Sequence, residues 1–208
     1  MRHNAFMASH DKSTFVGRGG VKLAHALAEF SLDVTGLRCA DFGCNVGGFT
    51  DCLLQAGAAH VVAVDTGYGA LAYTLRIDDR VTVMERTNAL HAPPPSELVD
   101  LVVVDLAWTP QRRAVPAALK WLKPGESSRI ITLIKPHYEA EGVGKKDRLV
   151  DGVLPEQDAE SVLSLVLDDM PAHGADVIAC TRSPILGGAG KKRKSGNIEW
   201  LALLHPSA

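Results

Sequence analysis

Short, almost wholly apolar runs alternate with amphipathic segments along this chain, and the alternation restricts the folds that it can adopt. The clearest run, residues 98–104, contains only valine and leucine apart from Asp100. Continuous apolar runs are typical of strands buried on both faces, whereas a strand with one wet face alternates apolar and polar residues. We therefore predict a largely parallel α/β sheet that is covered by helices on both faces.

Helices and strands are predicted in turn along the sequence. Helical spacing of apolar residues predicts helices over 21–30, 47–55, 69–75, 110–122 and 157–170. Aliphatic runs predict strands over 37–42, 60–64, 81–85, 98–104, 129–134, 177–180 and 198–204. The last two strands are expected to have only a turn between them and to form an antiparallel pair at one edge of a seven-stranded sheet. Ligands of such sheets bind beyond the carboxyl ends of the strands, where the strand order reverses.

Length and composition favour one globular domain. The chain has 208 residues, of which 46% are hydrophobic and 22% are charged, and we expect a tail over 1–13 followed by a single domain over 14–208. No apolar run approaches the roughly 20 residues that cross a bilayer. The N-terminal residues also lack the apolar core of a signal peptide. We therefore expect a cytoplasmic protein without a membrane partner.

Metal binding and bulk attraction to nucleic acid are both disfavoured. The four cysteines form no Cys-x-x-Cys pair and the eight histidines form no His-Glu-x-x-His motif, so we predict buried free thiols and no metal site. Lysine and arginine total 22 against 24 acidic residues, which argues against a protein that coats nucleic acid by net charge alone. A localised basic face is still possible, and the clearest basic run is Lys191, Lys192, Arg193 and Lys194.

A glycine-rich segment follows the first predicted strand and opens the next helix. It reads Asp41-Phe-Gly43-Cys-Asn-Val-Gly47-Gly48-Phe-Thr. Its glycines allow a tight turn and a close approach of ligand to backbone, but their spacing is not the Gly-x-Gly-x-x-Gly of dinucleotide sites. The spacing suits S-adenosylmethionine (SAM), which has no pyrophosphate. The backbone would face the methionine end of SAM, and Asp41 would help to receive its ammonium group.

Two later segments extend this predicted nucleoside site. Asp65 ends the second predicted strand, where a carboxylate can accept hydrogen bonds from both ribose hydroxyls. Asn88 follows the third strand and could hydrogen-bond the edge of an adenine. Turn chemistry alone would explain the glycines, but a glycine loop followed by a strand-end acid indicates a nucleoside cofactor.

Four charged residues are expected at the same edge of the sheet. Asp105 ends the fourth predicted strand and Lys135 ends the fifth, and neighbouring strands lie about 4.8 Å apart, so these side chains can meet. Lys22 lies at the start of the first predicted helix, and Glu199 lies near the start of the last strand. Taken singly, Asp105 and Lys135 are explained better as a structural ion pair. Lys22 alone could be an exposed helix lysine, and Glu199 alone could be a solvent-facing strand residue.

Together, the four residues suit methyl transfer to a sugar hydroxyl. A hydroxyl is a poor nucleophile because it holds its proton at neutral pH, and in-line attack on a sulfonium methyl requires that proton to be leaving or well hydrogen-bonded. A neutral amine can accept the proton, and burial or a second nearby ammonium lowers the usual lysine pKa of about 10.4. Asp105 would orient Lys135, and Glu199 would orient Lys22 or the hydroxyl, while positioning supplies most of the rate.

With these residues in view, the chain resembles the FtsJ-like ribose 2′-O-methyltransferases, and within them the TlyA (hemolysin A) family of rRNA methyltransferases. The resemblance covers nearly all of the chain from residue 14 onward, and is carried by 17–23, 41–53, 64–69, 85–89, 103–105, 133–136 and 196–199. It implies a Rossmann-like class I methyltransferase fold, SAM as the cofactor, and RNA as the substrate, in the form of rRNA or a ribosomal particle.

The resemblance also implies roles for individual residues. The lysine–aspartate–lysine–glutamate tetrad of the FtsJ-like enzymes falls on Lys22, Asp105, Lys135 and Glu199. The residues that we expect to bind SAM are Asp41, Gly43, Cys44, Asn45, Gly47, Gly48, Phe49, Thr50, Asp65, Thr66, Asn88 and Asp105.

The chain departs from the family pattern in two places. TlyA-like proteins usually carry a small RNA-binding domain before the first motif, whereas only a short tail precedes Arg18 here, so we expect RNA to be recognised by other surfaces or by a partner. After Asp105 the family tends to have a serine and an aromatic residue, and this chain has Leu-Ala-Trp108-Thr. Trp108 is expected either to stack on an RNA base, which is worth about 1–3 kcal/mol, or to cap the sheet from the core. The RNA contacts that we predict are Arg18, Trp108, Lys191, Lys192, Arg193 and Lys194, with a solvated loop as the alternative for the basic run.

Other functions fit part of the same pattern. Methylation of a small molecule or a protein keeps the cofactor site and suits the low net charge, but the tetrad opposes it. A non-catalytic relative that binds SAM or RNA would not need all four charged residues. A membrane-lytic function, which the hemolysin name suggests, would need an amphipathic cationic helix that this sequence lacks. The glycine-rich segment 139–152 is interpreted as a mobile loop beside the site.

Overall fold

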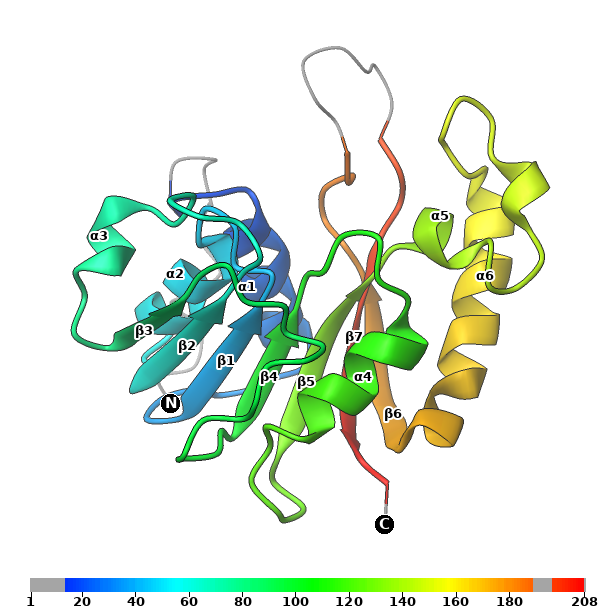
Figure 1. Ribbon diagram of the computed structural model, residues 1–208. Helices are drawn as coiled ribbons and strands as arrows, with labels where there is room; N and C mark the ends of the chain where they lie inside the picture. The colour runs from blue at the N-terminus through cyan, green and yellow to red at the C-terminus, as the bar shows by residue number, and fades with distance from the viewer. Residues whose placement is uncertain (1–13, 189–195, 208) are drawn as a thin grey trace, which may run out of the picture.

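A seven-stranded mixed sheet forms the centre of the computed structural model, which describes residues 14–188 and 196–207 (Figure 1). The strand order is β3-β2-β1-β4-β5-β7-β6. The pairs within β3-β2-β1-β4-β5 are parallel, and β7 runs antiparallel to both β5 and β6. The predicted sheet, mostly parallel with an antiparallel edge, is therefore confirmed. The strand order reverses next to β1, between the segments that follow β1 and β4.

The strands lie on the predicted apolar runs, with small shifts at their ends. They are β1 (Arg38–Phe42), β2 (His60–Val64), β3 (Val81–Met84), β4 (Leu101–Val104), β5 (Arg129–Ile134), β6 (Ala175–Arg182) and β7 (Trp200–Pro206). The expectation of a mere turn between the last two strands is wrong, because residues 183–199 connect them. The described parts of this connection, 183–188 and 196–199, lie at the carboxyl edge of the sheet and are joined by a backbone bridge between Gly187 and Asn197.

Four of the five predicted helices are present, and the fifth is much shorter than predicted. They are α1 (Gly19–Glu29), α2 (Gly48–Gln55), α4 (Gln111–Leu119) and α6 (Glu156–Asp169), with α3 reduced to Tyr73–Arg76. The predicted start of α3 at residue 69 is wrong because Gly69 has a φ of 72° and its amide hydrogen-bonds Glu85. One helical turn, α5 (Pro136–Glu139), was not predicted. The 3-10 turns are η1 (Lys146–Arg148) and η2 (Met170–His173).

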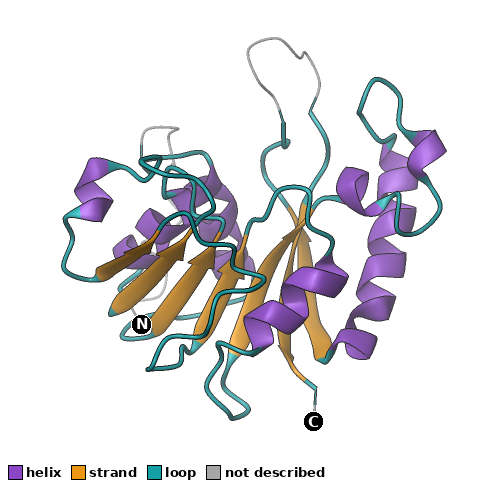
Figure 2. Cartoon of the chain, viewed as in Figure 1, coloured by secondary structure: helices purple, strands orange, loops and turns teal. Residues whose placement is uncertain are grey.

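Helices cover both faces of the sheet, and each face has its own hydrophobic core (Figure 2). On one face α1 and α2 pack with Leu23 and Leu53 against the strands. On the other face α4 and α6 contribute to a core that includes Trp121, whose ring meets Phe42 edge-on at a centroid distance of 4.9 Å. All four residues of β4 are buried. Burial on two faces explains why the strands carry continuous apolar runs.

The segment 139–152 is tied to the sheet at its end. It follows α5, contains η1 and ends in a bridge between Val150 and Val153. The side chain of Asn197 accepts a hydrogen bond from the amide of Leu154 and donates one to the carbonyl of Gly152, both at 2.9 Å. The mobility of the rest of this segment stays a prediction, as do the domain limits 1–13 and 14–208. No helix within residues 14–188 and 196–207 is both long and apolar enough to cross a bilayer.

Candidate active site

The glycine loop between β1 and α2 has the tight geometry that its composition predicts. Gly43 and Gly47 have φ values of 88° and 100°, a region that glycine enters freely. A β-carbon on Gly43 would lie 2.5 Å from the carbonyl oxygen of Asp105, and one on Gly48 would lie 2.8 Å from the amide nitrogen of Gly20. The loop can therefore pack against both β4 and α1 only because these positions lack side chains.

Asp41 lies fully buried beneath this loop. Its Oδ2 atom accepts hydrogen bonds from the backbone nitrogen and the hydroxyl of Thr50, at 2.9 and 2.7 Å, and so caps the start of α2. Its Oδ1 atom is buried and has no protein partner. Burial raises the pKa of Asp41 to about 7; the hydrogen bonds from Thr50 oppose this shift, and the nearby charges of Asp105 and Asp65 add to it.

Asp65, at the end of β2, also holds the loop in place. Its two carboxylate oxygens accept hydrogen bonds from the backbone nitrogens of Asn45 and Gly67, at 2.8 and 2.7 Å. Each oxygen keeps a further lone pair that could accept a hydroxyl. Thr66 and Asn88 are exposed, and the Oδ1 atom of Asn88 accepts a hydrogen bond from the amide of Leu90 in a local turn.

A cavity of about 290 Å³ opens between the glycine loop and the carboxyl ends of β4 and β5. The predicted site residues that line it are Lys22, Gly43, Cys44, Asn45, Gly48, Phe49, Asp105, Lys135 and Glu199. Asp41, Gly47, Thr50, Asp65, Thr66 and Asn88 do not line this cavity, although Asp41 and Asp65 hold the loop that does. The structure thus brings all four members of the predicted tetrad together, next to part of the predicted cofactor site.

The four charged residues form two ion pairs. The Nζ atom of Lys22 lies 2.5 Å from Oε2 of Glu199, and the Nζ atom of Lys135 lies 2.5 Å from Oδ1 of Asp105. The first pair is almost wholly buried, with Lys22 8% and Glu199 3% exposed. Lys135 also donates a hydrogen bond to the carbonyl of Leu106 at 3.1 Å. Buried pairs of this kind are held in fixed positions because a lone buried charge would be strongly unfavourable.

Four separate elements supply these side chains. Lys22 projects from α1, Asp105 and Lys135 follow β4 and β5, and Glu199 directly precedes β7. A β-carbon on Gly187 would overlap the carboxylate of Glu199. The connection between β6 and β7 therefore leaves room for Glu199 by having a glycine opposite it.

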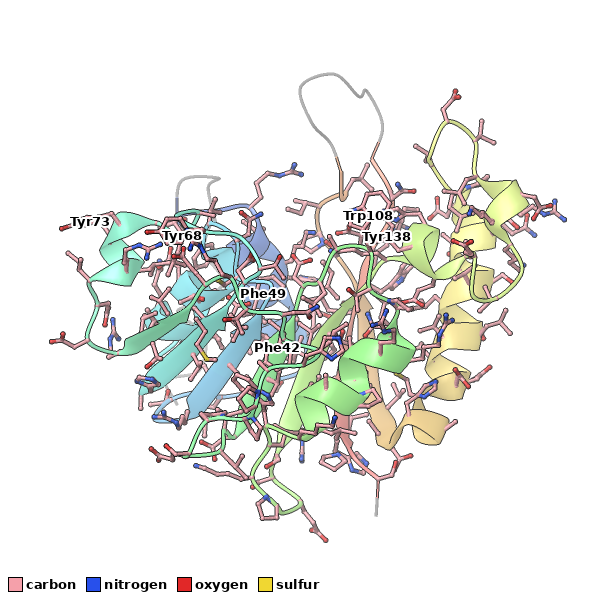
Figure 3. All side chains as sticks on the ribbon, viewed as in Figure 1. Phe42, Phe49, Tyr68, Tyr73, Trp108 and Tyr138 are labelled. Carbon is pink, nitrogen blue, oxygen red and sulfur yellow. The ribbon has the colours of Figure 1, made fainter. Side chains whose placement is uncertain are left out.

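An aromatic pair, formed by the exposed Trp108 and the half-buried Tyr138, lies beside the cavity. Trp108 is 80% exposed, so the alternative of a core aromatic is wrong. Its ring packs on Tyr138, with centroids 4.6 Å apart and planes inclined by 32°, and Figure 3 shows both residues at the carboxyl edge of the sheet. The Nζ atom of Lys135 lies 5.8 Å from the centroid of the Tyr138 ring. Trp108 has a φ of 57°, which is rare for a bulky residue and often marks a functional position.

Sequence reasoning missed six residues that line the cavity, and two of them, His137 and Tyr138, carry polar rings. Both directly follow Lys135-Pro136, so their nearness to a predicted catalytic residue was the available signal. Of the predicted RNA contacts, Arg18 is exposed and donates a hydrogen bond to the carbonyl of Leu186 at 3.0 Å. The basic run from Lys191 to Lys194 lies outside the described residues.

The cysteines are free thiols. Cys39, Cys44 and Cys52 are buried, as predicted, whereas Cys180 is exposed, so the prediction is wrong there. Cys180 lies on β6, the edge strand of the sheet. Within the described residues, no three His, Cys, Asp or Glu side chains are grouped as metal ligands would be.

Comparison with known proteins identifies the family. The FtsJ-like methyltransferase family matches residues 15–193. The chain belongs to this family. FtsJ-like methyltransferases use SAM as the methyl donor, so the predicted cofactor is confirmed.

Two curated relatives of this FtsJ-like methyltransferase are each 40% identical to it. One is a candidate rRNA methyltransferase, YqxC of Bacillus subtilis, matched over 92% of this chain and 66% of the relative. The other is the 16S/23S rRNA (cytidine-2′-O)-methyltransferase TlyA of Mycobacterium tuberculosis, matched over 95% of this chain and 71% of the relative. The chain thus spans about two thirds of the length of these relatives.

Solved structures share the fold of this FtsJ-like methyltransferase. A candidate hemolysin from Streptococcus thermophilus is 36% identical and superposes with a TM-score of 0.85, over 96% of this chain and 70% of that one. A candidate SAM-dependent methyltransferase from Listeria monocytogenes is only 14% identical but has a TM-score of 0.64, over 92% of this chain and all of that one. The predicted Rossmann-like class I methyltransferase fold is therefore confirmed.

Proposed function

We propose that this chain transfers the methyl group of SAM to a ribose 2′-hydroxyl of RNA, in rRNA or a ribosomal particle. The observation that carries the proposal is the convergence of the tetrad Lys22, Asp105, Lys135 and Glu199 on one cavity beside the glycine loop. The choice of RNA is supported by TlyA of M. tuberculosis, a 40% identical rRNA 2′-O-methyltransferase. A substrate of this kind places the reaction in the cytoplasm.

The residues around the glycine loop fit SAM. The loop presents backbone rather than side chains at Gly43 and Gly48, which a ligand can approach closely. The buried Oδ1 atom of Asp41 has no protein partner and suits a cationic group such as the ammonium of the methionine end. When bound, SAM supplies an electrophilic methyl group on a positively charged sulfur.

Lys135 is placed to accept the proton of the attacking hydroxyl. To act as the base, Lys135 must first release to solvent the proton that it holds in its ion pair with Asp105. The neutral amine that results has two N–H groups and one lone pair. The structure provides two acceptors for Lys135, the carboxylate of Asp105 and the carbonyl of Leu106, at 2.5 and 3.1 Å. With both N–H groups donated to these acceptors, the lone pair is left to take the hydroxyl proton.

The second ion pair positions the hydroxyl. The carboxylate of Glu199 holds the Nζ atom of Lys22 at 2.5 Å, in a part of the cavity wall that is almost inaccessible to solvent. An ammonium fixed in this way can donate a hydrogen bond to the ribose oxygen and keep it in line with the methyl group. Such alignment is worth far more than the strength of any single contact. The exposed ring of Trp108 would stack on the base of the same nucleotide, and Arg18 would meet the RNA backbone.

Methyl transfer from labelled SAM to total RNA tests the proposal. The label should enter RNA and, after digestion to nucleosides, should be found on the ribose. The methyl group should also protect the adjacent phosphodiester from alkaline hydrolysis, because that cleavage needs a free 2′-hydroxyl. Label in a base would contradict the ribose target. Label in protein or small molecules would instead favour the alternative acceptors, and SAM binding without any transfer would favour a non-catalytic relative.

A further inference from the structure

A buried polar cluster lies behind the aromatic pair, outside the lining of the catalytic cavity. The Oε1 atom of Glu139 accepts a hydrogen bond from the backbone nitrogen of Gln111 at 2.8 Å. The side chain of Gln111 donates to the carbonyl of Leu133 at 3.2 Å and accepts from the hydroxyl of Thr132 at 2.6 Å. Glu139, Gln111 and Thr132 are 6%, 4% and 0% exposed. The cluster therefore joins the start of α4, the end of β5 and the end of α5.

Glu139 is an unusual residue to find in such a place. Burial raises its pKa to about 7, against the opposing effects of the Gln111 hydrogen bond and the Arg112 charge. Ionisable side chains are rarely buried unless they are paired or hydrogen-bonded. The hydrogen bond to Gln111 accounts for the position of Glu139 and makes the contact between α4 and α5 specific.

This contact is one of three hydrogen bonds between the segments that carry the aromatic pair, because the side chain of Gln111 also donates to the carbonyl of Leu133. Trp108 belongs to the segment 106–111, and Tyr138 belongs to the segment 133–139. On the cavity side, Lys135 donates a hydrogen bond to the carbonyl of Leu106. On the far side, Glu139 accepts the hydrogen bond from Gln111. The stacked rings lie on segments that are held together at both ends.

The backbone at Trp108 needs such support. Its φ of 57° falls in the left-handed region, which is sparsely populated for aromatic residues and persists only where the surrounding structure holds it. If Glu139 were removed, the side chain of Gln111 would stay bonded to Thr132 and Leu133, but its backbone nitrogen would lose its acceptor. The backbone between Trp108 and α4 could then relax, and we expect the ring of Trp108 to leave Tyr138.

We propose that Glu139 is a positioning residue for RNA binding, because its hydrogen bond to the first residue of α4 keeps Trp108 stacked on Tyr138 as a platform for a nucleotide base. This inference rests on the proposed function in RNA methylation. Glu139 acts through the two rings and does not touch the substrate.

Two variants separate the hydrogen bond from the charge. Glu139→Gln keeps an acceptor oxygen for the Gln111 amide, whereas Glu139→Ala removes it. We expect E139A to raise the KM for RNA by about tenfold, the order of a lost base stack. Its kcat and its Kd for SAM should stay within about twofold of wild type, and E139Q should keep the RNA KM within about twofold, because neither change touches the tetrad or the glycine loop.

Trp108 itself supplies a spectroscopic readout. Trp121 and Trp200 are 1% and 7% exposed against 80% for Trp108, so acrylamide quenching of tryptophan fluorescence reports mainly on Trp108. E139A should increase the quenching and E139Q should not. In a Trp108→Ala background, E139A should raise the RNA KM no further, because both changes remove the same platform.

Several outcomes would overturn the inference. These are additive effects of W108A and E139A, an E139Q variant as impaired as E139A, or an E139A variant with unchanged quenching and unchanged RNA KM. Failure of the proposed function is a distinct result: if the wild-type protein methylates no RNA, the role in RNA binding falls with it, while the quenching comparison still reports whether Glu139 holds Trp108 in place.

Discussion

Gly187 lies directly against the carboxylate of Glu199, at a distance that leaves no room for even a β-carbon. The backbone of Gly187 exchanges two hydrogen bonds with Asn197, at 2.8 and 3.0 Å, which prevents it from moving aside. Glu199 is held between this bridge and Lys22. The position of the carboxylate that we propose to be catalytic therefore depends on a residue that has no side chain.

Gly187→Ala should displace Glu199 and break its contact with Lys22. We expect kcat to fall by about 100-fold, since a misplacement of about 1 Å in a reacting constellation has an effect of this size, while the Kd for SAM changes little. Steady-state kinetics and calorimetric titration with SAM measure the two quantities. Glu199→Asp shortens the side chain, so G187A/E199D should be more active than the product of the two single effects. A fully active G187A variant would show that Glu199 needs no fixed position.

Replacement of Lys135 tests the proton acceptor. Lys135→Ala should lower kcat by about 10²–10⁴-fold, the usual contribution of a general base, and should leave SAM binding within a few-fold of wild type. Lys135→Arg is the matched variant, because it keeps a positive charge and its donors but cannot lose a proton. It should be as inactive as K135A in a single-turnover assay. Substantial activity in K135R would mean that Lys135 acts by charge alone.

The buried carboxyl of Asp41 predicts a pH dependence of stability. Its pKa is about 7 in the folded chain against 3.8 without the fold, so between these values the folded state holds a proton that the unfolded state has lost. The stability that the neutral carboxyl supplies is complete below pH 3.8 and is lost as the pH rises through about 7. Asp41→Asn should match wild type near pH 4 and exceed it by up to about 4 kcal/mol at pH 8.

Urea unfolding of both forms without SAM, at several pH values from 4 to 8, measures this difference. Glu139→Gln serves as the comparison, because Glu139 is a second buried carboxyl with a pKa raised to about 7. Its effect on the free energy of unfolding should add to that of D41N. Parallel stability curves for wild type and D41N would show that Asp41 is charged in the folded protein at neutral pH.

The basic run from Lys191 to Lys194 is predicted to bind RNA phosphates. Replacing its four residues by serine should reduce the slope of log K against log salt for RNA binding, by about 0.7 for each phosphate contact that is lost. Lys145 and Lys146 provide a matched control, because their ammonium groups contact Ser161 and Glu141. Their replacement by serine should leave the slope unchanged. An unchanged slope in the quadruple variant would contradict a phosphate-binding role.

The sheet and half of the tetrad could be derived from the sequence on physical grounds. Burial on both faces is what makes residues 101–104 uniformly apolar, so the strand is visible in the pattern. Asp105 and Lys135 meet because the carboxyl ends of adjacent parallel strands lie at one edge. The same rule explains why Asp65 approaches the glycine loop, where it accepts a hydrogen bond from the amide of Asn45.

The other half of the tetrad could not be derived in this way. Glu199 reaches the site only because β7 is inserted antiparallel between β5 and β6, which no local pattern indicates. The sequence places Glu199 near the start of the last strand, and the resemblance to the FtsJ-like enzymes assigns it to the tetrad. The helix α5 has four residues, too few to show a periodicity. The sequence leaves undecided whether Trp108 is buried or exposed, because its ring packs on Tyr138 of α5, a helix that no pattern reveals. The cofactor contact of Asn88 stays a prediction, and the hydrogen bond that its Oδ1 atom accepts from the amide of Leu90 was not expected.

The place of β7 in the sheet sets an order of events during synthesis. Its neighbours β5 and β6 both precede it in the chain, so each must wait with an unpaired edge until the last strand arrives and fills the gap between them. Glu199 enters the site with that same strand. A nascent chain that has not yet made β7 is thus prone to pair with strands of other chains. Under the proposed mechanism it also lacks Glu199, so we expect methyl transfer to begin only when the sheet is complete.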